Sequence, residues 1–262
     1  MRHDSVDLAT SRRERVDFPA IELGRDLERG GSSDARAIGD ITADAFRDDP
    51  FNRWLFGRFA GMAGVFGALA RHVYLPRGYC IRMGDEGAAM WMLPGGDLEP
   101  PLRALPALYG AVLFGSTWGA KRRTDAAVAA MARHHPAFPH AYLFTIGVRP
   151  SARGKGLGRS LIQPVLDACD RAGVPAYLEN SNPANRGFYR SCGFERQAMI
   201  DVMPGAPPLE AMLRPPRWVS PSGRGWRSAP AGQAGVLVPT APWQCLYLLP
   251  DPQGHGALRL IS

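Results

Sequence analysis

The chain has 262 residues and a formal net charge of +7 at pH 7, and 45% of its residues are hydrophobic. This length is sufficient for one full domain with its own core plus terminal segments. The arginines are scattered, and no helix-turn-helix or RNA-binding signature occurs, so we expect no nucleic-acid partner. The positive charge falls mostly on residues 34–214 and suits an anionic small molecule, such as a nucleotide-based cofactor.

Charge and cysteine usage point to a cytoplasmic protein. Residues 2–15 are rich in charged side chains and lack the apolar segment of a secretory signal. The longest uncharged stretch, residues 104–120, is shorter than the roughly 20 residues that span a bilayer, so we expect no membrane association. The four cysteines show neither a C-x-x-C pair nor a zinc spacing, which predicts reduced thiols and no metal. They are Cys80, Cys169, Cys192 and Cys245.

Composition divides the chain into three parts. Residues 1–33 have no sustained apolar period and end in two glycines and two serines, so they are predicted to be a flexible N-terminal arm. Proline and glycine make up about 29% of residues 215–262, which predicts a largely disordered C-terminal extension. Within this extension, residues 243–249 are apolar enough to add a strand. Residues 34–214 are therefore predicted to form the domain.

The first half of the domain is mostly helical in its apolar pattern. Ile38, Ile41, Ala45 and Phe46 recur at helical spacing before Asp48-Asp49-Pro50 ends the helix. A turn of glycines and acidic residues at 84–87 then joins two short apolar runs, which is typical of a hairpin. The predicted elements of this half are helices at 35–47, 51–56, 62–74 and within 98–134, and strands at 79–83 and 88–93.

The second half alternates strands with helices, which predicts an α/β fold whose sheet carries helices on both faces. Residues 142–148 form an aromatic and β-branched strand, and Gly147 within it is expected to loosen the strand or to produce a bulge, with an ordinary strand glycine as the alternative. An apolar helical stripe at residues 161–169 follows, with Gly173 as its C-cap. Further strands are predicted at 175–179, 194–203 and 209–213, and a further helix at 184–192.

A glycine-rich basic loop, Arg153-Gly154-Lys155-Gly156-Leu157-Gly158, stands between that strand and that helix. Free N–H groups at a helix N-terminus favour a bound anion, and glycines let the backbone approach phosphate oxygens. No string matches the spacing of a Walker A loop. The dinucleotide fingerprint fails because Arg159 occupies the place of its third glycine. A turn without a ligand remains the structural alternative.

Arg153, Gly156 and Gly158 instead match the pattern R/Q-x-x-G-x-G/A. With this pattern, residues 142–193 resemble the GNAT superfamily of N-acetyltransferases. The runs at 173–179 and 185–194 are most similar to its puromycin N-acetyltransferase-like subgroup. The resemblance implies a mixed, mostly antiparallel central sheet and acetyl-CoA as the cofactor.

The same resemblance implies roles for individual residues. Tyr189 would be the general acid that protonates the departing sulfur. Glu179 is the candidate general base because of its own position, at the end of a strand beside the loop. The strand before the loop would contact the pantetheine arm through its main chain, and Asn185 would hydrogen-bond the cofactor. The implied cofactor-binding residues are Ile146, Gly147, Val148, Arg153, Gly154, Lys155, Gly156, Leu157, Gly158, Arg159 and Asn185.

Each role has an alternative at this stage. Tyr189 can pack in the core, and Glu179 can brace neighbouring chain while water removes the proton. His134, His135 and His140 can serve as the base or be structural. Asp48 and Asp49 can meet a cationic amine or simply terminate a helix.

We therefore expect acetyl transfer from acetyl-CoA to a primary amine of a small molecule, by direct attack in a ternary complex, in a monomer or homodimer. The alternatives are acetylation of a protein lysine or N-terminus, and a non-catalytic acyl-CoA sensor.

Overall fold

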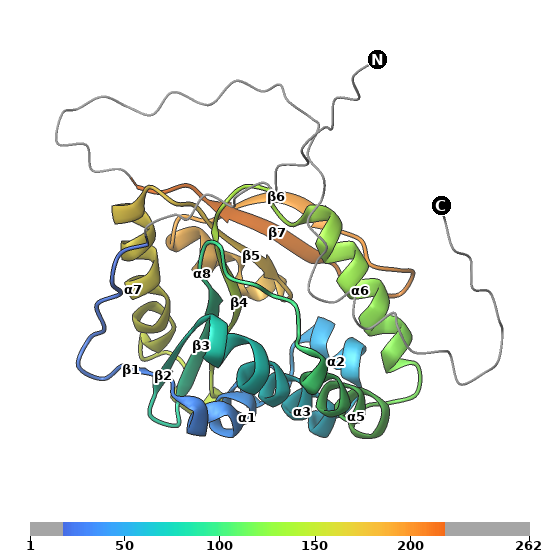
Figure 1. Ribbon diagram of the computed structural model, residues 1–262. Coiled ribbons are helices and arrows are strands. Elements are labelled where there is room, and N and C mark those ends of the chain that lie inside the picture. The colour runs from blue at the N-terminus through green and yellow to red at the C-terminus, as the bar shows by residue number, and fades with distance from the viewer. Residues whose placement is uncertain (1–17, 218–262) are drawn as a thin grey trace, which may run out of the picture.

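A seven-stranded sheet runs through the centre of the protein, which the computed structural model describes for residues 18–217 (Figure 1). The strand order is β1-β2-β3-β4-β5-β7-β6, and only β4 and β5 pair in parallel. The predicted mixed, mostly antiparallel sheet is thus confirmed. The strands are β1 (Glu28–Arg29), β2 (Tyr79–Met83), β3 (Gly87–Met92), β4 (Ala141–Val148), β5 (Ala176–Asn180), β6 (Glu195–Ile200) and β7 (Leu209–Arg214).

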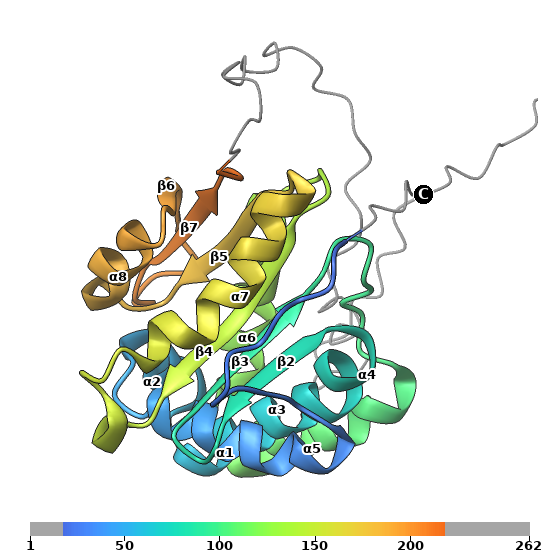
Figure 2. The ribbon, with the colours of Figure 1, turned by 90° about the vertical axis from the view of Figure 1, so that its left-hand side faces the viewer.

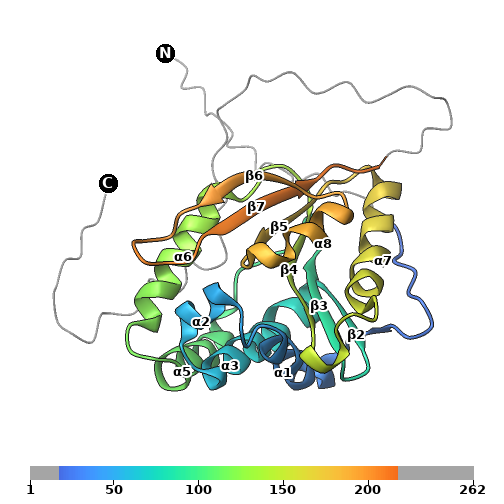
Figure 3. The same ribbon diagram turned by 180° about the vertical axis from the view of Figure 1, so that it is seen from behind.

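Helices cover both faces of the sheet, and Figures 2 and 3 show α6 and α7 on opposite sides of it. One apolar cluster joins α1, α2, α3, α5 and α6 to the sheet, and a second lies beneath α7 and α8. No helix within residues 18–217 is long and apolar enough to cross a bilayer. The helices are α1 (Ala35–Ala45), α2 (Pro50–Phe56), α3 (Phe59–Leu69), α4 (Leu75–Arg77), α5 (Leu105–Gly115), α6 (Ala120–His134), α7 (Leu157–Ala172) and α8 (Arg186–Ser191).

The segment before α1 differs from the flexible arm that we predicted for residues 1–33. Residues 28 and 29 pair with β2, and Phe18, Ile21, Leu23 and Leu27 pack against the apolar cluster under α7. Residues 18–33 thus belong to the fold, because an extended segment can bury apolar side chains without a helical period. The rest of the predicted arm, residues 1–17, lies outside the described residues, as do residues 218–262 with the strand proposed at 243–249.

The bulge in β4 does not lie at Gly147. Met90 pairs with Thr145 and Trp91 pairs with Leu143, so Phe144 is the extra residue on β4. Gly147 stays in register opposite Ala88. Its lack of a side chain is needed for packing instead, because a Cβ atom there would lie 2.7 Å from the Cβ of Ala45 in α1. The predicted position was therefore wrong, although the strand does carry a bulge.

Beyond Leu143 the strands β4 and β5 separate. Their parallel pairing covers only residues 141–143 and 176–178, whereas β4 continues along β3 to Val148 and β5 continues along β7 to Asn180. Residues 144–148 consequently have no partner strand on the β5 side, which leaves backbone groups at the middle of the sheet available to another molecule.

The close crossing of α1 and α3 gives a test of the packing. A Cβ atom at Gly39 would lie 2.6 Å from the Cα of Gly67, so Gly39→Ala must push the two helices apart. We expect a loss of about 1–3 kcal/mol in the free energy of unfolding, measured by urea denaturation. Gly110→Ala in α5 is the control, because no atom beyond the adjoining backbone of α5 and the two neighbouring residues lies within 4 Å of its Cβ position, and alanine favours the helix. Equal stability of the two variants would contradict this packing.

Candidate active site

The glycine loop between β4 and α7 is shaped by two residues with left-handed backbone. Gly154 and Gly156 have φ values of 81° and 80°, which only glycine adopts readily. Gly156 is the N-cap of α7, and the N–H groups of residues 154–158 make no hydrogen bond to other parts of the described chain. Five adjacent N–H groups at a helix N-terminus form a site for an anion.

A cleft of about 480 Å³ lies beside this loop and extends along the unpaired part of β4. It gathers all but one of the predicted cofactor residues, from Ile146 on β4 to Asn185 before α8. Lys155 is the exception, and its Nζ atom lies 3.4 Å from Oε1 of Glu86 in the turn between β2 and β3. The lining residues among those predicted are Ile146, Gly147, Val148, Arg153, Gly154, Gly156, Leu157, Gly158, Arg159 and Asn185.

Two arginines of the loop anchor it to the fold. Arg153 donates a 2.8 Å hydrogen bond to the carbonyl of Ala45 at the end of α1, and a longer one to Val148. Arg159 donates to the carbonyl and the hydroxyl of Ser191 at the end of α8. Both side chains line the cleft, while the N–H groups of residues 154–158 keep no partner within the described chain.

A second cavity, of about 130 Å³, lies where β4 and β5 separate and has residues of both strands in its lining. Its walls are side chains of α2, α3, α5 and α6 together with β4, and most of them are apolar or aromatic. Glu179 is its one charged residue among those described. The polar lining residues are Asn52, Thr124, Thr145, Glu179, Ser181 and the hydroxyl-bearing Tyr142 and Tyr189.

Tyr189 lies where the two cavities meet. The cleft and the apolar pocket share Phe46, Ile146 and Tyr189 as lining residues. Tyr189 belongs to α8, and its side chain is buried in the protein. Burial, together with the negative charge of Asp49, raises the pKa of its hydroxyl above the usual value. The hydroxyl is therefore protonated at neutral pH and able to donate a proton.

Glu179 stands at the point where β5 leaves β4. Its side chain is 5% exposed, and its Oε1 atom has no hydrogen-bond partner within the described chain. The same oxygen is 3.7 Å from His135 Nδ1. Burial first, and then the charge of Glu179, raise the pKa values of Tyr74, Tyr142 and Tyr177, so neutral hydroxyls surround the carboxylate. A buried oxygen without a partner is costly unless it binds something.

Asp49 has a structural role, which from the sequence alone was only one of two alternatives. It caps the N-terminus of α2, where its Oδ1 accepts hydrogen bonds of 2.8 Å from the backbone and side chain of Asn52. Its Oδ2 accepts a 2.8 Å bond from Ser181 Oγ, which ties α2 to the loop after β5. Burial raises the pKa of Asp49. Asp48 and Asp49 both line the cleft beside the glycine loop, so capping of a helix and a place at the candidate site coincide.

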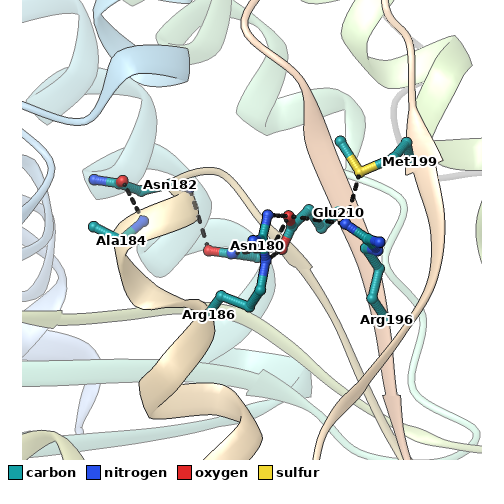
Figure 4. A network of polar contacts seen from close by, with 7 residues as sticks. All are labelled: Asn180, Asn182, Ala184, Arg186, Arg196, Met199 and Glu210. Atoms are coloured by element: carbon teal, nitrogen blue, oxygen red, sulfur yellow. Dashed lines mark hydrogen bonds and ion pairs between the residues drawn. The ribbon is translucent and has the colours of Figure 1, made fainter.

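A polar network that the sequence did not predict holds the loop between β5 and α8 (Figure 4). Buried Glu210 on β7 binds Arg186 at the start of α8 and accepts a 3.1 Å hydrogen bond from Asn180. Asn180 accepts from the N–H of Asn182, which in turn accepts from that of Ala184. Hydrogen bonds from Arg186 lower the pKa of Glu210. The network fixes the direction of α8 and with it the position of Tyr189.

Residues 96–194 match the family model of the acetyltransferase (GNAT) family. The chain is also 28% identical over 217 residues to an uncharacterized N-acetyltransferase of Schizosaccharomyces pombe, a match that covers 72% of this chain and 83% of that protein. The chain contains a GNAT acetyltransferase domain and is an N-acetyltransferase.

Other similarities agree with this assignment. A mycothiol acetyltransferase of Thermomonospora curvata is 42% identical over 73 residues, which are 27% of this chain and 24% of that protein. The crystal structure of histone acetyltransferase HPA2 and related acetyltransferase from Corynebacterium glutamicum gives a TM-score of 0.54 at 25% identity. That match covers 72% of this chain and 95% of that one.

GNAT acetyltransferases use acetyl-CoA, and the GNAT domain of this chain has features that fit it. The N–H groups of residues 154–158 suit a pyrophosphate, and the unpaired edge of β4 suits the amides of a pantetheine arm. Within residues 18–217 no group of three or more His, Cys, Asp and Glu side chains is arranged to hold a metal ion.

The loop glycines allow a matched test of cofactor binding. Gly156→Ala forces a left-handed alanine beside the cleft, at a cost on the order of 1 kcal/mol, and displaces the N–H groups that follow. We expect about tenfold weaker binding of CoA by calorimetry. Gly205→Ala in the turn before β7 carries the same strain, with a φ of 83°, but lies outside the cleft and should bind CoA normally. Unchanged affinity in both variants would exclude the loop as the pyrophosphate site.

Proposed function

We propose that the protein transfers the acetyl group of acetyl-CoA to the primary amine of a small, largely apolar molecule by direct attack in a ternary complex. The observation that carries this proposal is the meeting of the cofactor cleft and the apolar pocket at Tyr189. A donor in the cleft and an acceptor in the pocket would face each other there, so no relay of the acetyl group through the protein is needed.

The loop and β4 would hold the donor. The N–H groups of residues 154–158 bind the pyrophosphate, and Arg153 and Arg159 add positive charge at either end of the loop. The main chain of Ile146, Gly147 and Val148 would pair with the pantetheine arm in place of a neighbouring strand, and Asn185, which lines the same cleft, would hydrogen-bond it. Bound acetyl-CoA supplies an activated thioester at the gap between β4 and β5.

Glu179 and Tyr189 would move the protons. Glu179 removes a proton from the substrate ammonium, so that the nitrogen lone pair can form the new N–C bond as the C–S bond breaks. Tyr189 gives its hydroxyl proton to the departing sulfur and regains one from the acylated nitrogen. Tyr189 and most of the pocket walls are buried, which limits the access of water to the pocket.

The pocket walls favour an acceptor with an apolar body. Aliphatic and aromatic side chains, among them Phe51, Phe56 and Phe66, make up most of the lining, and burial of apolar surface against them contributes about 25 cal/mol per Å². One carboxylate in such a pocket attracts a cationic amine and leaves few partners for a polar peptide backbone. One relative is named for mycothiol and one structural neighbour for histones, so the test includes both classes of acceptor.

Purified protein is incubated with acetyl-CoA and either apolar primary amines or peptides with a free N-terminus or lysine, with thiol release as the readout. We expect turnover with apolar amines. Turnover with peptides alone would replace the proposal by protein acetylation, and CoA binding without release on any acceptor would favour a sensor.

Tyr189→Phe tests the acid in the same assay. We expect kcat to fall about 100-fold or more with the affinity for CoA unchanged, because the ring remains and only the proton donor is lost. Tyr79→Phe on β2 is the control and should keep full activity. The raised pKa of Tyr189 also predicts that the wild-type rate does not fall as pH rises through about 10, where an ordinary tyrosine ionises. Full turnover by Tyr189→Phe would remove Tyr189 from the mechanism.

A further inference from the structure

Two histidines lie next to Glu179 in the structure and are not among the residues that line the apolar pocket. His135 follows the last residue of α6, and His140 immediately precedes β4. The Nδ1 atom of His135 is 3.7 Å from Glu179 Oε1, and its Nε2 atom is 3.1 Å from His140 Nε2. The Nδ1 atom of His140 is 2.8 Å from the carbonyl oxygen of Phe138. Glu179, His135 and His140 thus form a continuous row that starts at the pocket.

These contacts fix where the protons of the neutral rings lie. A carbonyl oxygen only accepts hydrogen bonds, so His140 carries its proton on Nδ1 and presents the lone pair of Nε2 to His135. His135 must then donate from Nε2, which leaves its Nδ1 lone pair facing Glu179. His135 is therefore held as a proton acceptor toward the carboxylate.

We propose that His135 takes from Glu179 the proton that Glu179 removes from the substrate ammonium, and that His140 is a positioning residue that sets the tautomer of His135. This rests on the proposed role of Glu179 as the base. In the step, the O–H bond of protonated Glu179 breaks and an N–H bond forms at His135 Nδ1, which regenerates the carboxylate and leaves an imidazolium. The imidazolium then releases a proton to water, because a quarter of the His135 side chain is exposed.

Aromatic neighbours hold the ring of His135 in line with this row. Its plane is nearly perpendicular to the rings of Tyr142 and Tyr177, at centroid distances of 4.9 and 5.2 Å. The regenerated carboxylate lies on one side of the imidazolium and neutral His140 on the other. Burial lowers the pKa of His140 to about 4, so His140 remains an uncharged acceptor at neutral pH.

Among the described groups that face Glu179, only His135 can accept its proton. The titratable side chains recorded against Glu179 and His135 are Tyr74, Tyr142, Tyr177 and His140, and the three tyrosines hold their protons because burial raises their pKa values. His134 does not take part, because its Nδ1 lies 3.0 Å from the carbonyl of Ala130 in its own helix. At 3.7 Å the Glu179–His135 pair is about half an ångström longer than a hydrogen bond, so transfer requires a small rotation of the carboxyl group.

Kinetics of histidine variants test the step, with the amine that the wild-type enzyme acetylates as substrate. We expect His135→Ala to lower kcat about 10- to 100-fold without changing the KM for acetyl-CoA, and added imidazole to restore part of the rate. His134→Ala, the neighbouring histidine, should retain the wild-type rate and show no response to imidazole. A wild-type rate in His135→Ala, or an equal loss in both variants that imidazole does not restore, would overturn the proposal.

A second measurement does not depend on turnover. Nitrogen-15 spectra of the full-length protein labelled at its six histidines report the tautomer of each ring. We expect neutral His135 with its proton on Nε2 and neutral His140 with its proton on Nδ1, and we expect His140→Asn to abolish the single tautomer at His135. A proton on His135 Nδ1 would overturn the proposal even in an active enzyme. The expected tautomers in a protein that acetylates no amine would instead contradict the proposed function.

Discussion

β4 and β5 share three rungs of parallel pairing, at residues 141–143 and 176–178, and then part. Every component of the candidate site depends on this separation. It leaves the main chain of Ile146, Gly147 and Val148 without a partner strand, and it places Glu179 at the first position beyond the paired region. Both cavities open into the gap, with Tyr189 of α8 between them. The bulge at Phe144 turns β4 at the same place, so sheet geometry rather than any single side chain creates the site.

Burial gives the groups around the gap their chemical character. Tyr189 remains a proton donor because burial and the charge of Asp49 oppose its ionisation. The network centred on Glu210 holds the loop before α8, and the hydrogen bonds of Asp49 hold α2 to the loop after β5. Burial also raises the pKa values of Cys80 and Cys169 to about 12, and that of Cys192 above its usual value. None of these three thiols is therefore available as a thiolate to carry an acetyl group, which agrees with direct transfer between bound substrates.

Local sequence patterns predicted much of the fold and singled out most of the residues that line the cleft beside the glycine loop. The spacing of Arg153, Gly156 and Gly158 is local, so the loop could be recognised from the sequence as a candidate anion site. The apolar pocket could not, because its walls come from four helices and β4, and no periodicity shows which faces of α3 and α5 enclose a cavity. Glu210 lies 24 residues beyond Arg186, and the sequence pattern does not connect them. Gly147 was noticed but misinterpreted, because a strand glycine has the same appearance whether it marks a bulge or the crossing of a helix.

Direct transfer in a ternary complex is the central claim, and initial-velocity kinetics with acetyl-CoA and an accepted amine, both varied, test it most directly. If donor and acceptor meet at Tyr189, double-reciprocal plots against the amine at several acetyl-CoA concentrations intersect, and protein incubated with acetyl-CoA alone gains no acetyl group in intact-mass spectra. Parallel lines together with a stoichiometric gain of one acetyl group that the amine then removes would show a covalent acetyl-enzyme and contradict the account.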